Sequence, residues 1–286
     1  SCVQMGSSPT VSNSNRTFTV APSLKMFYSA TYKIRVTDNA SDSAGNNIDN
    51  HTQTYGFETT ITIPMTAGSA YSCFMLDNGS VKCWGKNNLG QLGLGDTINR
   101  GDNSSEMGDN LTAIDLGSGR TAISVTTGSK HSCALLDDDS VKCWGKGHAG
   151  QLGHGKTSSL DSPPNSPINL GSEITAKAIT AGKFHTCAVI DNSSIKCWGL
   201  NDSGQLGQGN TSNRGDGSNM GDNLPAVDLG AGKTARAIST GDRHTCAILD
   251  NASIKCWGKN DSGQLGLGDN STRGGGSGEM DNLPSI

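Results

Sequence analysis

Aromatic residues are scarce in this 286-residue chain, and so are long apolar segments. Phe, Trp and Tyr make up 5% of the residues, and there are only 8 prolines. No uninterrupted apolar run reaches the about 18 residues that a membrane-spanning helix needs, so no membrane insertion is expected. Excess positive charge is absent too, because the formal net charge is −4. The sequence therefore lacks the electrostatic signature of a nucleic-acid or anionic-membrane ligand.

Glycine, by contrast, is abundant. The chain has 39 glycines, about twice the usual share of roughly 7%, and it is also rich in Asn, Ser and Thr. Such a composition is typical of short strands joined by many turns, and it disfavours long helices. We therefore predict an all-β protein.

Eight of the nine cysteines belong to a motif that occurs four times. Its copies are CFMLDNGSVKCWG, CALLDDDSVKCWG, CAVIDNSSIKCWG and CAILDNASIKCWG, and the sequence GQLG follows each one. The copies recur at intervals of roughly 54 to 60 residues, and such a period predicts stacked supersecondary units. Repeated units favour display and binding over a single catalytic centre.

The spacing within the motif predicts a strand hairpin closed by a disulfide. When each copy is folded about its middle, its two cysteines lie opposite each other, and in the second copy Leu135 faces Val141. Zinc is the alternative, but zinc cysteines are usually spaced two to four residues apart. Disulfides would place the protein outside a reducing cytosol. The predicted pairs are Cys73 with Cys83, Cys133 with Cys143, Cys187 with Cys197, and Cys246 with Cys256.

The wider pattern G-x-x-H-[ST]-C-A-[LIV]-x-D…[VI]-K-C-W-G-x-[ND]-x-x-G-Q-L-G resembles the regulator of chromosome condensation repeat, in its secreted bacterial variety. It covers about 220 residues and implies β-propeller blades of four strands, usually seven in a ring. With four copies, we expect an incomplete ring. Three arrangements would cover the open blade faces. These are further repeats after Ile286, neighbouring molecules packed on those faces, or closure into a compact four-bladed ring. The expected repeats are about 63–122, 123–176, 177–235 and 236–286.

Residues 1–62 lack the repeat and show short alternating segments instead. The stretches FTVAPSL, TYKIRVTDNASDSAGN and YGFETT resemble the second half of a bacterial immunoglobulin-like domain. A complete sandwich of this type needs roughly 100 residues, so we expect a partial immunoglobulin-like β-sandwich. The odd cysteine, Cys2, would then have its partner upstream; a lipid anchor is the alternative.

Two aromatic positions recur in the repeats. A tryptophan follows the second cysteine of each motif, and we expect it to pack between blades rather than stack on sugars. A histidine stands two residues before the first cysteine in three copies, where the first copy has Tyr71. Because tyrosine breaks the series, we expect a structural hydrogen bond and not a metal site. These residues are Trp84, Trp144, Trp198 and Trp257, and His131, His185 and His244.

The longest and most variable segments are the loops after GQLG, at about 95–115, 154–170, 208–225 and 268–284. Two contain Arg-Gly-Asp, a tripeptide associated with integrin recognition, although shared ancestry of the loops also explains it. Their carboxylates could hold calcium, yet no twelve-residue calcium loop is present. The candidate binding residues are Arg100, Asp102, Asp109, Arg214, Asp216, Asp222 and Arg273.

No catalytic constellation or nucleotide-binding motif is evident. We therefore expect a non-enzymatic extracellular or bacterial cell-surface protein for adhesion, binding or surface-fibre construction, without a cofactor. Its partner would be a protein, a cell-surface polymer or copies of itself arranged head to tail. The alternatives are a secreted inhibitor of a soluble enzyme, since a β-lactamase inhibitory protein shares this propeller type, and a nucleotide exchange factor like the eukaryotic namesake.

Overall fold

The computed structural model describes residues 65–286 and, before them, only a few short strands. The chain separates into two compact units, Ser1–Thr62 and Ile63–Ile286. The strands of the first unit form three antiparallel pairs: β1 (Thr10–Ser12) with β2 (Thr17–Thr19), β3 (Thr31–Tyr32) with β6 (Phe57–Glu58), and β4 (Arg35–Val36) with β5 (His51–Thr52). The predicted immunoglobulin-like sandwich and Cys2 otherwise lie outside the described residues.

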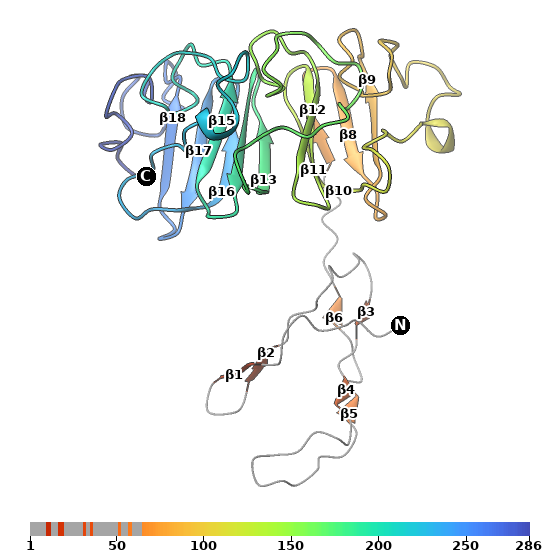
Figure 1. The fold of residues 1–286 in the computed structure, drawn as a ribbon, viewed down its shortest axis with the longest axis horizontal. Helices are drawn as coiled ribbons and strands as arrows, with labels where there is room; N and C mark the ends of the chain where they lie inside the picture. The colour runs from red at the N-terminus through yellow and green to blue at the C-terminus, as the bar shows by residue number, and fades with distance from the viewer. Residues whose placement is uncertain are drawn as a thin grey trace. The chain divides into compact units, whose positions relative to one another are not determined.

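The second unit is built from four three-stranded antiparallel sheets that lie side by side in chain order (Figure 1). This confirms the predicted all-β architecture of repeated blades. Two short 3₁₀ turns, Gly108–Asn110 and Gly221–Asn223, interrupt the connecting loops. The blades are β7 (Met65–Ala67), β8 (Tyr71–Met75) and β9 (Val81–Gly85); β10 (Ala122–Thr127), β11 (His131–Leu136) and β12 (Val141–Gly145); β13 (Ala176–Ala181), β14 (His185–Ile190) and β15 (Ile195–Gly199); and β16 (Ala235–Thr240), β17 (His244–Leu249) and β18 (Ile254–Gly258).

The hairpin register is the predicted one in all four copies. In the second blade Leu135 pairs with Val141, and the same pairing of apolar residues recurs in the other blades. The parity of the strand pattern places both cysteines on the same face as the apolar pair.

Each hairpin is closed by its own disulfide, as the cysteine spacing predicts. The two Cα atoms lie 4.1 Å apart in every copy, because the cysteines are directly opposed on neighbouring strands. The zinc alternative is therefore wrong, since these sulfur atoms are bonded to each other. The disulfides join Cys73 to Cys83, Cys133 to Cys143, Cys187 to Cys197, and Cys246 to Cys256.

The expectation of four strands per blade is wrong, because each sheet has three. In the second blade, the segment that would form the fourth strand makes only an isolated bridge between Gly145 and Leu160 and one hydrogen bond from the Ile168 N–H to the Val141 carbonyl. The first repeat makes the same single bond, from the Ile114 N–H to the Val81 carbonyl, in a segment without proline. The segment therefore follows the blade edge without becoming a regular strand.

The core lies between blades, where the cysteine-bearing face of one sheet packs on the opposite face of the next. At the second junction, Leu135 and Val141 lie in one buried cluster with Ala188, Ile190 and Trp198 of the third blade. Equivalent clusters fill the first and third junctions. Within residues 65–286, the first and fourth blades do not pack on each other in this way, so the ring is not closed. No helix in this described region has the length and apolar character to cross a membrane.

The position of a disulfide in the stack predicts its order of reduction. Cys133 and Cys187 are fully buried by the following blade, whereas Cys246 on the fourth blade is half-buried. Thiol–disulfide exchange requires access to a sulfur atom. With limiting dithiothreitol and dilute native protein, we expect alkylation and peptide mass spectrometry to find the bond from Cys246 to Cys256 reduced first. Equal labelling in urea is the control, and earlier reduction at Cys133 would contradict the expectation.

Candidate binding loops and blade junctions

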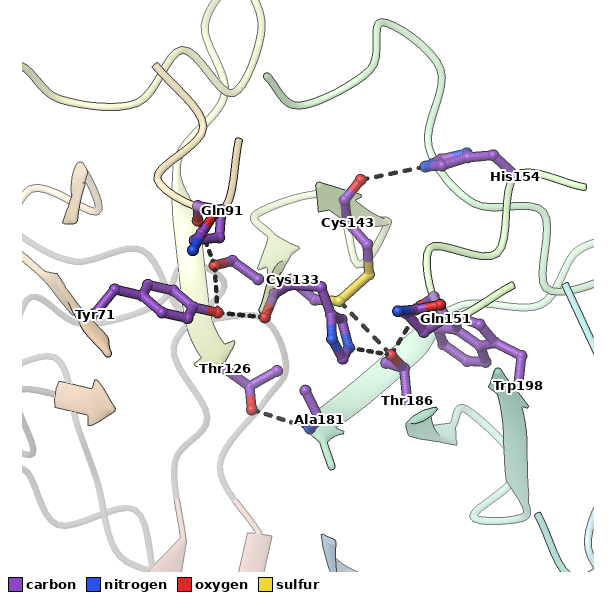
Figure 2. Close-up of a disulfide and its surroundings, with 12 residues drawn as sticks. Tyr71, Gln91, Thr126, Cys133, Cys143, Gln151, His154, Ala181, Thr186 and Trp198 are labelled. Carbon is purple, nitrogen blue, oxygen red and sulfur yellow. Dashed lines mark hydrogen bonds between the residues drawn. A yellow bond between two sulfur atoms is a disulfide. The ribbon is translucent and has the colours of Figure 1, made fainter. Parts of the chain in front are cut away.

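The recurring tryptophans close the junctions between blades. Trp198 is completely buried, and its indole N–H donates to the Gln151 carbonyl oxygen of the preceding blade at 3.0 Å (Figure 2). Trp257 makes the same bond to Gln205, also at 3.0 Å. Trp84 has no preceding blade among the described residues and is only half-buried. The predicted packing role is thus confirmed. The glutamine of GQLG supplies a main-chain acceptor at the second and third junctions, whereas the buried Trp144 N–H at the first junction has no hydrogen-bond partner.

The recurring histidines complete these junctions through a hydroxyl relay. The His131 Nε2 atom lies 3.0 Å from the Thr186 hydroxyl, which donates to the Gln151 carbonyl at 2.9 Å. His185 and Thr245 repeat the contact at the third junction. Each threonine hydroxyl donates its proton to a main-chain carbonyl, so it must accept a hydrogen bond from the histidine Nε2–H. The histidine is therefore the neutral tautomer protonated at Nε2. The predicted structural hydrogen bond is therefore present.

Burial and the relay together keep these two histidines neutral. Nδ1 of His131 and Nδ1 of His185 are both buried without a hydrogen-bond partner. A second proton on Nδ1 would therefore carry a charge into a site with no acceptor. Desolvation lowers the pKa of both imidazoles to about 3, and a neighbouring histidine adds to the effect in each case.

The first junction uses a non-titrating version of the relay. Tyr71 replaces histidine there, and its hydroxyl donates to the His131 carbonyl oxygen. The Ser132 hydroxyl lies 3.1 Å from the Tyr71 oxygen and 2.8 Å from the Gln91 carbonyl (Figure 2). Burial raises the pKa of the Tyr71 phenol well above its usual range. A tyrosine–serine pair thus forms the hydrogen bonds across this junction that a histidine–threonine pair forms at the other two.

Consecutive long loops are tied to one another along one side of the blades. The N–H groups of Gly95, Gly155 and Gly209 donate to main-chain oxygens of the following repeat's loop, at 2.9 to 3.1 Å. The first glycine of GQLG lies against the same loop: a Cβ atom at Gly150 would collide with the Arg214 carbonyl oxygen. Only glycine allows this close approach of two backbones. The loops therefore form a continuous rim.

The three candidate arginines hold these loops in shape. The main chains of Arg100, Arg214 and Arg273 each bridge the glycine that follows the blade tryptophan. The Arg100 guanidinium lies 2.6 Å from the Asp96 carboxylate and 2.8 Å from the Ile98 carbonyl. With its guanidinium bonded inside the loop, Arg100 is not a free recognition group. Arg214 bonds only the Asn213 carbonyl, so the integrin hypothesis stays a prediction.

The candidate carboxylates are accessible on the rim. Asp102, Asp109 and Asp216 are exposed. Asp222 is exposed as well, and it accepts hydrogen bonds from the N–H and hydroxyl of Ser172 on the preceding repeat, at 2.7 and 2.8 Å, which lower its pKa. In the part of the chain that the structure describes, no three His, Cys, Asp or Glu side chains are placed to share a metal ion.

Two structural devices in the loops went unnoticed in the sequence. One is a side-chain oxygen that accepts the N–H of the glycine after the candidate arginine, at 2.7 or 2.8 Å; Glu106, Asn219 and Glu279 supply it in three repeats. The other is the lysine before the second cysteine. Buried lysines at this position donate from their amines to main-chain carbonyls, and the invariant lysine in V/I-K-C-W-G was the available signal. The pairs are Lys142 with Leu116 and Lys196 with Leu170.

Comparison with known proteins agrees with this architecture. A family model described as Regulator of chromosome condensation (RCC1) repeat matches residues 65–91, 122–151, 176–205 and 235–264, and a second matches 138–189 and 197–248. The ultraviolet-B receptor UVR8 of Arabidopsis thaliana is 34% identical over 73% of this chain and 44% of its own length. The human E3 ubiquitin-protein ligase HERC2 is 27% identical over 72% of this chain and 4% of its own length.

Solved structures share the fold at lower identity. Human WBSCR16 superposes with a TM-score of 0.62 and 19% identity, covering 84% of this chain and 57% of its own. Yeast RCC1 (Prp20), solved bound to Kap60, gives a TM-score of 0.57 and 18% identity, with 80% and 50% coverage. This chain thus spans about half the length of these structures, and less than half of the curated relatives. The chain belongs to the family of proteins built from Regulator of chromosome condensation (RCC1) repeats.

Proposed function

We propose that this protein is a non-enzymatic, extracellular surface protein that binds a protein or a cell-surface polymer through its rim loops. Four internal disulfides favour an oxidising compartment. Its relatives include a receptor and an RCC1 protein solved with a bound protein, which supports a protein partner. Adhesion and the building of a surface fibre are the roles that fit such a module.

The observation that carries the proposal is the contrast between a constant scaffold and a variable, polar rim. The junction residues repeat from blade to blade, whereas the loops at 95–115, 154–170, 208–225 and 268–284 differ in sequence. Acidic side chains outnumber basic ones in the first, third and fourth of these loops. Because Arg100 and Arg273 pair with carboxylates of their own loops, the groups left for a partner are mainly carboxylates and amides. We therefore propose a partner with a basic or amide-rich surface.

The test is to neutralise rim carboxylates and measure binding. Labelled protein is titrated onto intact cells and onto immobilised cell-surface polymers, and Asp102→Asn/Asp109→Asn is compared with the wild type. We expect at least a tenfold loss of affinity, about 1.4 kcal/mol, and weaker binding as salt is raised. Asp77→Asn/Asp191→Asn, at exposed hairpin tips away from the rim, is the control. Equal binding by all three proteins would contradict the proposal.

A further inference from the structure

The fourth blade ends the described stack with an uncovered apolar face. Ile248 and Ile254 are 43% and 36% exposed. Their counterparts on the third blade, Val189 and Ile195, are 5% and 0% exposed because the fourth blade packs on them. The fourth blade therefore presents to solvent the surface that its neighbours use as core.

The first blade presents the opposite kind of face. Met65 is 72% exposed, and Phe74, Leu76 and Trp84 are half-buried. These side chains share a strand face and lie at the positions that are buried against the preceding blade elsewhere. The two outer faces of the stack are thus the two halves of one junction. The buried counterparts on the second blade are Val125, Ala134, Leu136 and Trp144.

Their hydrogen-bonding groups complement each other as well. At the third junction, His185 and the Gln205 carbonyl on one blade meet the Thr245 hydroxyl and the Trp257 indole N–H on the next. The fourth blade offers His244 Nε2 and the Gln264 carbonyl oxygen, and among the described residues neither has such a partner. The first blade offers the Ser72 hydroxyl and the Trp84 indole N–H. Each group missing from one face is present on the other.

The backbones match in the same way. At the closed junctions, the first glycine of GQLG lies against the next repeat's arginine–glycine loop, as Gly150 and Gly204 do. The corresponding Gly263 has open space around it within the described structure, and so does Gly268. On the first blade, the loop at 100–102 is the element that would fill this space.

We propose that the fourth blade of one molecule docks on the first blade of a second copy, so that molecules join through the same junction that joins blades. The inference goes beyond the proposed rim binding, because it uses the outer faces of the first and fourth blades and names a second copy of this chain as the partner. The contact is heterologous, because different surfaces meet. It therefore produces either a closed ring of molecules or an open filament.

One residue departs from the pattern. Phe74 stands where the other three blades have alanine, at Ala134, Ala188 and Ala247. Its ring lies edge-on to Trp84, with 5.8 Å between centroids. Extra volume at a packed junction is unfavourable. If molecules join in the register of the blades, Phe74→Ala must tighten the association.

Sedimentation velocity on the full 286-residue chain tests this, from low to high micromolar concentration. We expect the wild type to form dimers or larger assemblies as concentration rises. Ile248→Asp and Met65→Asp should each weaken association by at least about tenfold, because each buries a charge in one half of the junction. Ile98→Asp replaces another exposed isoleucine, on a rim loop, and should associate normally. Tryptophan fluorescence and near-UV circular dichroism verify that every variant is folded.

Mixing the two blocked variants distinguishes this contact from a symmetric one. Ile248→Asp retains an intact first blade and Met65→Asp an intact fourth blade, so an equimolar mixture should give a one-to-one dimer and nothing larger. Dimer formation on mixing and tighter self-association of Phe74→Ala support the proposal. A monomeric wild type, no dimer on mixing, or weaker association of Phe74→Ala would overturn it. The rim variant Asp102→Asn/Asp109→Asn should assemble normally, so failure of the rim proposal and of this one are separable.

Discussion

Truncating Trp198 to alanine is expected to lower the free energy of unfolding of the blade unit by about 3–5 kcal/mol. The indole is fully buried between the second and third blades, and it also satisfies the Gln151 carbonyl. Its removal leaves a large cavity and removes one of the two hydrogen bonds to that carbonyl, to which the Thr186 hydroxyl still donates. Urea titration followed by tryptophan fluorescence measures the change, because all four tryptophans of the chain lie in the repeats.

The chain supplies two controls for this result. Trp198→Phe keeps most of the volume and loses only the N–H bond, so it should be destabilised by about 1–2 kcal/mol. Trp84→Ala changes the same repeat position on the half-buried outer face, and in dilute protein it should be affected much less than Trp198→Ala. If Trp84→Ala and Trp198→Ala lowered the free energy of unfolding equally, burial at the junction would not be what determines the contribution of this tryptophan to stability.

Mild acid is expected to destabilise the blades through His131 and His185. Their pKa is about 3 in the folded protein and about 6.5 when unfolded. Between these values the unfolded chain binds more protons, so stability is fully present above about pH 6.5 and falls as the pH decreases toward about 3. Each histidine should contribute a loss of about 2 kcal/mol between about pH 7 and pH 5. Most carboxylates stay ionised over that range.

The first junction provides the matched variant for this test. His185→Tyr/Thr245→Ser transplants the non-titrating Tyr71–Ser132 pair into the third junction. Urea unfolding at about pH 7 and pH 5 should show that the variant loses about 2 kcal/mol less than the wild type on acidification. Asp242 lies near His185 and opposes its pKa shift, so Asp242→Asn should increase the acid sensitivity slightly. An unchanged loss in the double variant would assign the acid effect to other groups.

The hairpins were predictable because their information is local and repeated. Cysteine spacing, strand parity and four agreeing copies determined which residues face each other, such as Leu135 and Val141, and the structure has the same pairs. The bonds from Cys73 to Cys83 and from Cys187 to Cys197 follow from the same spacing. The role of Trp198 also followed, since a position that recurs in every blade reflects a contact that recurs. The family resemblance supplied the propeller architecture.

The loops were less predictable because their contacts reach into the next repeat. Arg214-Gly215-Asp216 reads as a recognition tripeptide in the sequence, yet its backbone packs on Gly150 of the preceding repeat. Nothing local indicates this, since the two segments lie far apart in the chain. The prediction of a fourth strand in each blade was wrong for a related reason. Whether a segment joins a sheet depends on continuous backbone pairing, and in the second repeat the pairing is limited to the bridge at Leu160 and the single bond from Ile168.

Every strong tie between blades of this unit connects a blade only to the one before it or after it. A hydroxyl, an indole and a glycine on adjacent repeats complete each junction, and the packed strand pairs of the described region all belong to the same blade or to neighbouring ones. Energetically, such a stack is a one-dimensional chain of nearest neighbours. Duplication or deletion of a whole repeat in the gene would therefore leave complete junctions on both sides of the change. The number of repeats can thus change in evolution without substitutions in the buried residues.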